Sequence, residues 1–185
     1  SCLRERLGIP QDAVLLCSFG FVAPTKLNHL VCEAVRSVRH KTGVNFYYCM
    51  VGEGSYVDDQ LSGHVRVTGY VSEDEYESYM RCADLVVNLR YPSMGETSIA
   101  LLRAMSLGKP CIVTNHAWFS ELPDSAVIKT GIPPRENVAE QLTRAFSLFL
   151  DRGSSFDKMG AAAAEYVHSR CAPRVVAERL KQYLG

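Results

Sequence analysis

Short, continuous apolar runs alternate along this chain with longer amphipathic runs, and this alternation restricts the possible folds more than any other feature. Residues Ala13–Phe19 read AVLLCSF, as expected for a strand covered on both faces. Asn28–His40 then carry apolar residues at helical spacing. The repetition of strand and helix predicts an α/β fold, a Rossmann-like, doubly wound parallel sheet with helices on both faces.

The other elements are predicted from the same two patterns. We expect the Ser98–Leu107 helix to be buried because it is apolar almost all round, with Gly108 as its C-terminal cap. Ser72 and Glu75 form a capping box at the start of another helix. Further strands are expected at Phe46–Val51, Val65–Thr68, Leu85–Leu89, Cys111–Thr114 and Ala126–Lys129, and further helices at Glu73–Cys82, Asn137–Leu150, Ser155–Ser169 and Arg174–Leu184.

Size, charge and cysteine content restrict the class of protein. The 185 residues fit one domain, residues 1–185, and the formal net charge of zero argues against a nucleic-acid partner. No run of about 18 apolar residues predicts a transmembrane segment, and residues 1–10 have no signal-peptide stretch. The seven cysteines are scattered singly, which favours reduced thiols and a cytoplasmic location over a disulfide framework or a zinc site.

Glycine and polar residues concentrate where the predicted strands end. In a doubly wound sheet, ligands bind outside the carboxyl ends of the strands, at the point where the strand order reverses. The loops that follow the strands are therefore the expected ligand edge. They are Gly20–Asn28, Gly52–Tyr56, Gly69–Ser72, Arg90–Ser98 and Asn115–Pro123.

The most informative stretch is Arg90–Gly108, which reads RYPSMGETSIALLRAMSLG. A strand end, a glycine-containing loop and a helix start together predict an anion site, because the first helical turn leaves N–H groups unpaired and its dipole favours negative charge. Gly95 would let a ligand approach the backbone, and Thr97 and Ser98 would offer hydroxyls. Plain capping of the helix, without a ligand, is the alternative.

At these residues the sequence resembles the C-terminal, donor-binding domain of GT-B glycosyltransferases of the family 4, or group 1, type. The resemblance extends over nearly the whole chain, with several motifs in the right order. The matching segments are Pro92–Ser98 with Leu101–Ile112, Gly20–Lys26, Val51–Gly54, Val67–Val71, Cys82–Asp84 and Ser120–Pro123.

The resemblance implies roles for particular residues. The lysine that matches Lys26 contacts the donor diphosphate. In the family's E-x7-E pair, the first glutamate lies near the donor sugar, and Glu96 matches it after a one-residue shift. The second glutamate holds the ribose, and Arg103 stands in its place. Phe21 stands where a phosphate-binding arginine is usual.

These considerations yield a set of candidate residues. Arg103 is expected to pair with Glu96, two turns away on the same helix face, or to reach phosphate; snorkelling from the helix edge is the alternative. Glu96 is the catalytic candidate. The donor-binding candidates are Gly20, Lys26, Gly69, Tyr70, Val71, Arg90, Gly95, Thr97, Ser98 and Arg103.

The activity implied by the resemblance is transfer of a sugar from a nucleoside diphosphate sugar to an acceptor hydroxyl, in polysaccharide or glycoconjugate biosynthesis. No metal or other cofactor is expected. A glycan, a lipid-linked molecule or another acceptor would bind through an N-terminal domain that these residues do not contain. Peripheral contact with a membrane, if it occurs, would also be made by that domain.

Two alternatives remain at this stage. A non-catalytic nucleotide-sugar-binding or scaffold domain of the same fold would bind a donor without transferring sugar. An unrelated doubly wound binder is disfavoured, since no G-x-G-x-x-G motif follows Phe19 and no acidic cluster follows the first strand.

Overall fold

Six strands form one all-parallel sheet in a computed structural model that describes residues 3–151, 153–171 and 173–184. The strand order is β3-β2-β1-β4-β5-β6, so the direction of winding reverses between β1 and β4. The strands are β1 (Val14–Phe19), β2 (Phe46–Val51), β3 (Val65–Val67), β4 (Leu85–Asn88), β5 (Cys111–Thr114) and β6 (Ile128–Thr130).

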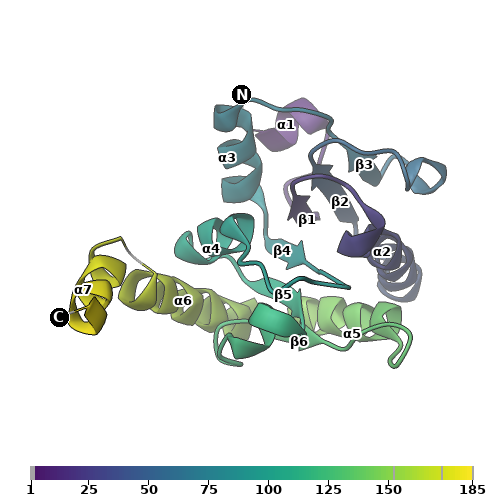
Figure 1. Ribbon diagram of the computed structural model, residues 1–185. Coiled ribbons are helices and arrows are strands. Elements are labelled where there is room, and N and C mark those ends of the chain that lie inside the picture. Colours follow the sequence, from purple (N-terminus) through teal and green to yellow (C-terminus); the bar gives the residue numbers. More distant parts are fainter. Residues whose placement is uncertain (1–2, 152, 172, 185) are drawn as a thin grey trace.

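Helices cover both faces of this sheet (Figure 1). One face is packed by α1 (Leu3–Leu7), α3 (Glu73–Cys82), α4 (Ile99–Ser106) and α6 (Gly153–Arg170). The other is packed by α2 (Asn28–Thr42) and α5 (Val138–Asp151), and α7 (Pro173–Leu184) lies at the far end of α6 (Figure 1). Short 3-10 turns occur at η1 (Pro24–Lys26), η2 (Asp58–Gln60) and η3 (Ala117–Glu121).

The central strand β1 shows why its sequence is continuously apolar. Successive side chains of a strand point to opposite faces, so Leu15 and Cys17 enter the core under α3 and α4, whereas Val14 and Leu16 enter the core under α2 and α5. Every residue of β1 is buried. A parallel strand covered on both faces has no polar side, and the prediction of a doubly wound sheet is confirmed.

The expected elements agree with the observed ones in type. The ranges predicted for β2, α3 and β5 are identical to those found, and Ser72 caps α3 by accepting the N–H of Glu75 at 3.3 Å. The last strand begins at Ile128, two residues later than expected, and α1 was not predicted. The Ser98–Leu107 helix, expected to be buried, is buried only in part: Leu101, Ala104 and Met105 are buried, whereas Ile99 is 74% exposed.

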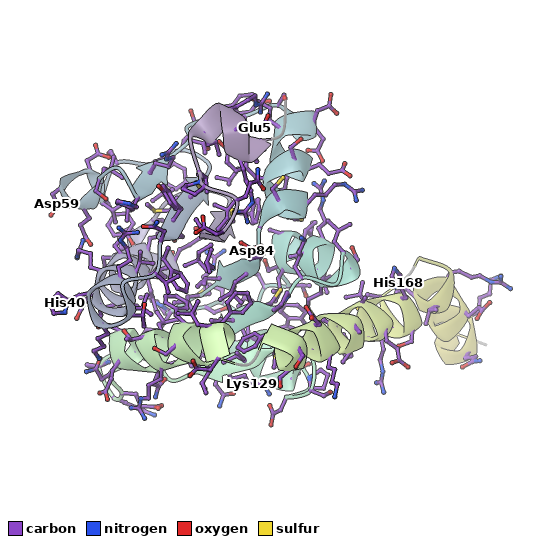
Figure 2. The ribbon with its side chains drawn as sticks, turned by 180° about the vertical axis from the view of Figure 1, so that it is seen from behind. Glu5, His40, Asp59, Asp84, Lys129 and His168 are labelled. Atoms are coloured by element: carbon purple, nitrogen blue, oxygen red, sulfur yellow. The ribbon has the colours of Figure 1, made fainter. Side chains whose placement is uncertain are left out.

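A buried arginine fixes α1 to the amino end of the sheet. The Arg4 guanidinium lies 2.5 Å from Asp84 and donates to the carbonyl of Ala13 at 2.8 Å, and Asp84 accepts the Leu15 N–H at 2.7 Å. Figure 2 labels Asp84 near the middle of the fold and Glu5 of the same helix α1 at its edge. The ion pair therefore connects α1, β1 and β4.

None of the described helices is long and apolar enough to cross a lipid bilayer. Cys17 in β1, Cys49 in β2 and Cys111 in β5 are buried free thiols. Burial raises the pKa of Cys49 to about 11 and that of Cys17 well above its ordinary value, so these thiols pack as apolar groups.

Two glycines set how closely α6 packs against the corner after α4. A Cβ on Gly160 would overlap the carbonyl oxygen of Gly108, which has φ +69° and ends the α4 turn. We expect Gly160→Ala to lower the free energy of unfolding by about 2 kcal/mol, because the backbones would have to separate. Gly153→Ala, at an open position of the same helix, should be neutral or stabilise by up to about 1 kcal/mol. Urea denaturation measures both variants, and equal unfolding midpoints would contradict this packing.

Candidate functional site

A pocket of about 350 Å³ opens at the carboxyl ends of β1 and β2. Its floor depends on two glycine turns that touch each other, since a Cβ on Gly52 would overlap the carbonyl of Gly20. Gly20 also has φ +92°, a conformation that favours glycine. The pocket is lined by Gly20, Phe21, Val51, Gly52, Glu53, Tyr70, Val71, Glu73 and Tyr76.

Lys26 lies directly beside this pocket. The turn η1 folds its side chain back, so that Nζ donates to the Phe19 carbonyl at 2.5 Å and lies 2.9 Å from where a Cβ on Gly20 would be. Burial lowers the pKa of Lys26 to about 8, and the nearby charge of Arg90 adds to the shift. The site therefore holds a cation that is readily stabilised by an added anion.

A buried polar cluster supports the loop that carries Lys26. Asn28, the first residue of α2, donates to the Tyr48 hydroxyl at 2.7 Å and to the Ser18 hydroxyl at 3.2 Å. Ser18 and Tyr48 are themselves 2.8 Å apart, while the Oδ1 atom of Asn28 is buried without a hydrogen-bond partner. Sequence reasoning missed this cluster, because single polar residues inside apolar runs produce no periodic pattern.

Arg90 and Glu96 face each other across the loop that follows β4. The Arg90 Nε atom is 3.3 Å from the Glu96 carboxylate, although it makes no hydrogen bond there. Glu96 also accepts the Ser93 hydroxyl at 2.9 Å and the Met94 N–H at 2.8 Å. Its own backbone N–H, followed by Ser93, lowers the pKa of Glu96, so the carboxylate stays ionised at neutral pH.

The start of α4 lies on the same edge as Lys26. Ser98 caps the helix by accepting the N–H of Leu101 at 3.2 Å, and it also accepts the side-chain amide of Asn88 at 2.9 Å. Asn88 and Lys26 line one narrow crevice, which places Lys26 and the α4 N-terminus on one side of the sheet. Ser98 therefore caps α4, while Thr97 next to it is exposed.

Arg103 does not pair with Glu96, which corrects that expectation. Glu96 precedes α4, which begins only at Ile99, so the two residues do not share a helix face. The guanidinium instead lies 2.6 Å from Glu73 on α3 and 5.0 Å above the ring of Tyr76. Arg103 thus contacts two residues of the pocket wall.

The structure brings the predicted residues together in two adjoining groups. Gly20, Tyr70 and Val71 line the pocket. Gly69, which has φ +72°, begins the turn that carries Tyr70 and Val71. The backbone N–H of Tyr91 donates to the Thr25 carbonyl at 2.8 Å and so joins the second loop to the first. The second group lies in the two loops that this hydrogen bond joins, and it contains Lys26, Arg90, Gly95, Glu96, Thr97 and Ser98.

Sequence reasoning missed several residues of the pocket wall. Glu73 was considered only as part of a capped helix start, although it directly follows a loop of the expected ligand edge. Tyr76, one turn later, packs its ring 4.9 Å from that of Phe19 and contacts the core. Phe21, Val51, Gly52 and Glu53 also line the pocket without being among the candidate residues. Over the described residues, no three His, Cys, Asp or Glu side chains gather as a metal site requires.

The coupling between Lys26 and Arg90 can be measured directly. Arg90→Gln removes a nearby like charge, so we expect the pKa of Lys26 to rise above its value of about 8 without full recovery, because burial is the larger cause. An NMR titration of ¹³C-labelled lysine follows this group. Arg144→Gln, on the exposed side of α5, is the matched control. An unchanged Lys26 titration in Arg90→Gln would show that the two cations do not interact.

Comparisons with known structures show the same fold at low sequence identity. The C-terminal domain of the glycosyl transferase group 1 protein LpcC from Francisella tularensis has a TM-score of 0.71 and 17% identity, with 85% of each chain covered. Anabaena Alr3699/HepE, solved in complex with UDP-glucose, has a TM-score of 0.79 and 18% identity, with 97% of this chain and 51% of that chain covered.

A third solved structure is WaaG, described as a glycosyltransferase involved in lipopolysaccharide biosynthesis. It has a TM-score of 0.73 and 20% identity, with 90% of this chain and 46% of that chain covered. The chain thus spans about half the length of HepE and WaaG. A comparison with curated protein sequences found no match.

Sequence-family comparison gives the assignment. The model of the family described as "Glycosyl transferases group 1" matches residues 13–151, which include all of the sheet and the loops at its carboxyl edge. This chain belongs to the glycosyl transferases group 1 family, with the architecture of the C-terminal domain of a GT-B glycosyltransferase.

Proposed function

We propose that this domain binds a nucleoside diphosphate sugar, with its diphosphate beside Lys26 and Arg90 and its nucleoside in the adjoining pocket. The observation that carries this proposal is the pair of neighbouring cations at the sheet edge, where Arg90 helps to lower the pKa of Lys26. Two like charges held together disfavour each other until an anion lies between them. A diphosphate supplies that anion, and the N-terminus of α4 adds a favourable dipole.

The proposed reaction is glycosyl transfer. The bond between the anomeric carbon of the sugar and the β-phosphate oxygen breaks, and the oxygen of an acceptor hydroxyl bonds to that carbon. The hydroxyl proton passes to a base, and the nucleoside diphosphate leaves with its added negative charge. Lys26, Arg90 and the first turn of α4 would stabilise that charge, as preorganised electrostatics do in other enzymes.

Glu96 is proposed to lie near the donor sugar. Its lowered pKa favours the carboxylate, which accepts hydrogen bonds from sugar hydroxyls but is a poor proton donor. Gly95 and Thr97 would contact the phosphates through exposed backbone and hydroxyl groups, and Gly69, Tyr70 and Val71 would border the nucleoside. No metal or further cofactor is part of this proposal.

The apolar surface of the same edge supports a second domain as a partner. The most exposed large apolar side chains of the described residues are Met94 at 96%, Tyr70 at 84%, Ile99 at 74% and Phe21 at 66%. All four belong to the loops and the helix start around the site. Exposed apolar groups gathered in one region mark an interaction surface, and we propose that an N-terminal acceptor domain faces them.

The proposed acceptor is defined by its chemical class. We propose a hydroxyl of a glycan, a lipid-linked molecule or another glycoconjugate precursor, bound by that second domain, and a cytoplasmic location where nucleotide sugars are available. Peripheral membrane contact would then also depend on the second domain.

Lys26→Ala tests the diphosphate site. Because a lysine point charge recognises phosphate and not base, the variant should weaken nucleoside diphosphate binding by about tenfold to a hundredfold and leave nucleoside binding nearly unchanged. Wild-type affinity for the diphosphate should fall as pH rises above about 8, when free Lys26 loses its proton, and this dependence should vanish in the variant. Calorimetry measures both effects. Lys158→Ala, on an exposed position of α6, is the control, and equal losses for nucleoside and diphosphate would remove Lys26 from the site.

Residues 1–185 alone should bind a nucleotide without transferring sugar. Half of the proposed cleft would be missing, so the donor would stay partly solvated and the acceptor would not be oriented. Calorimetry with UDP-, GDP-, ADP- and dTDP-sugars, beside a product assay on the same sample, tests this expectation. Robust acceptor glycosylation by these residues alone would refute the two-domain requirement. Donor binding without transfer when a second domain is present would favour the scaffold alternative.

A further inference from the structure

Glu73 lines the same pocket as the glycine turn beside Lys26. Gly20 lines it from the end of β1, where a Cβ would lie 2.9 Å from the Lys26 ammonium, whereas Glu73 lines it from the first residue of α3. A ligand whose phosphates lie at Lys26 and whose remaining part fills this pocket would therefore contact the wall that contains Glu73. The volume of about 350 Å³ is in the range of small-molecule sites.

The lining of this pocket suits a nucleoside. Phe21, Tyr70 and Tyr76 present aromatic groups on which a planar base can pack, and Glu73 presents a carboxylate. A carboxylate accepts hydrogen bonds but donates none when it is ionised. The part of a nucleoside that matches such an acceptor without regard to the base is the vicinal pair of ribose hydroxyls.

The side chain of Arg103 holds Glu73 in place. The Arg103 guanidinium lies 2.6 Å from its Oε1 atom and is itself placed over Tyr76 at 5.0 Å. Since Arg103 contacts Oε1, the Oε2 oxygen offers an acceptor for a ligand. The side chains of Arg103 and Glu73 are 38% and 72% exposed, and exposed ion pairs add little to stability. The arrangement therefore has its main effect on the position of the carboxylate.

We infer that Glu73, oriented by Arg103, accepts the ribose hydroxyls of the bound nucleotide. This inference rests on the proposed function, because it requires a nucleotide in the pocket. Glu53 also lines the pocket, from the end of β2. Glu73 is the better candidate because a carboxylate already fixed by a neighbour loses less conformational freedom on binding.

Calorimetry with matched ligands tests the inference. UDP, GDP and ADP are each titrated beside their 2′,3′-dideoxy counterparts into residues 1–185. Loss of the hydroxyls should weaken binding to the wild type by roughly tenfold, which corresponds to hydrogen bonds to a charged group. Glu73→Gln should weaken binding of the ribonucleotide by a similar factor, leave binding of the dideoxynucleotide nearly unchanged and so abolish the discrimination.

Arg103 is a positioning residue in this scheme. Arg103→Gln should reduce the ratio of the two affinities, and Arg103→Lys should restore part of it because the positive charge returns. A purely structural role would lower both affinities together and leave their ratio intact. Glu77→Gln, one turn further along α3, where the carboxylate pairs with exposed Arg81, is the matched control, and unfolding midpoints verify that every variant is folded.

The remaining outcomes of these titrations separate a failure of this inference from a failure of the proposed function. An unchanged ratio in Glu73→Gln, with diphosphate binding still dependent on Lys26, would overturn this inference and leave the proposed function standing. A ratio lost in Glu53→Gln but kept in Glu73→Gln would assign the hydroxyls to Glu53 and also overturn it. Absence of binding by every nucleotide, with the wild type folded, would refute the inference and the proposed function together.

Discussion

The reversal of strand order between β1 and β4 is the constraint on which the rest of the structure depends. Because α2 follows β1 on one face and α4 follows β4 on the other, the two connections leave the sheet in opposite directions. Space remains between them at the carboxyl edge, where neither helix covers the strand ends. The contact between the Gly20 and Gly52 turns then shapes one side of that space.

The charges of this protein have two kinds of surroundings. Arg4 is buried beside Asp84 and donates to a backbone carbonyl, so its charge is compensated and connects three elements. Lys26 is partly buried near Arg90, and both burial and the neighbouring charge disfavour its ammonium form. The proximity of Lys26 and Arg90 therefore adds little to the free energy of folding. A lysine whose pKa is lowered at a sheet edge is typical of ligand sites, and Lys26 therefore marks the candidate site more specifically than the fold does.

Much of the fold could be predicted from the sequence, because buried parallel strands are apolar on both faces and give continuous runs such as Phe46–Val51. The edge that carries the site followed from the same pattern. The partner of Arg103 could not be predicted, since Glu73 lies on a different helix and contacts between helices leave no local spacing. The error about Glu96 had a definite cause: the predicted helix itself begins at Ser98, so helical spacing to Arg103 was applied to a residue that precedes the helix.

The position of Arg103 also explains how this chain departs from the family pattern without losing an acidic group at the pocket. A glutamate is usual at this place, and it would lie in the last turn of α4, where the helix dipole disfavours a negative charge. Here the arginine in that turn is favoured by the dipole. Its partner Glu73 lies in the first turn of α3, where a carboxylate is favoured. Each charge stands at the helix end that stabilises it, so the pair places a carboxylate at the pocket wall from α3 at little electrostatic cost to the fold.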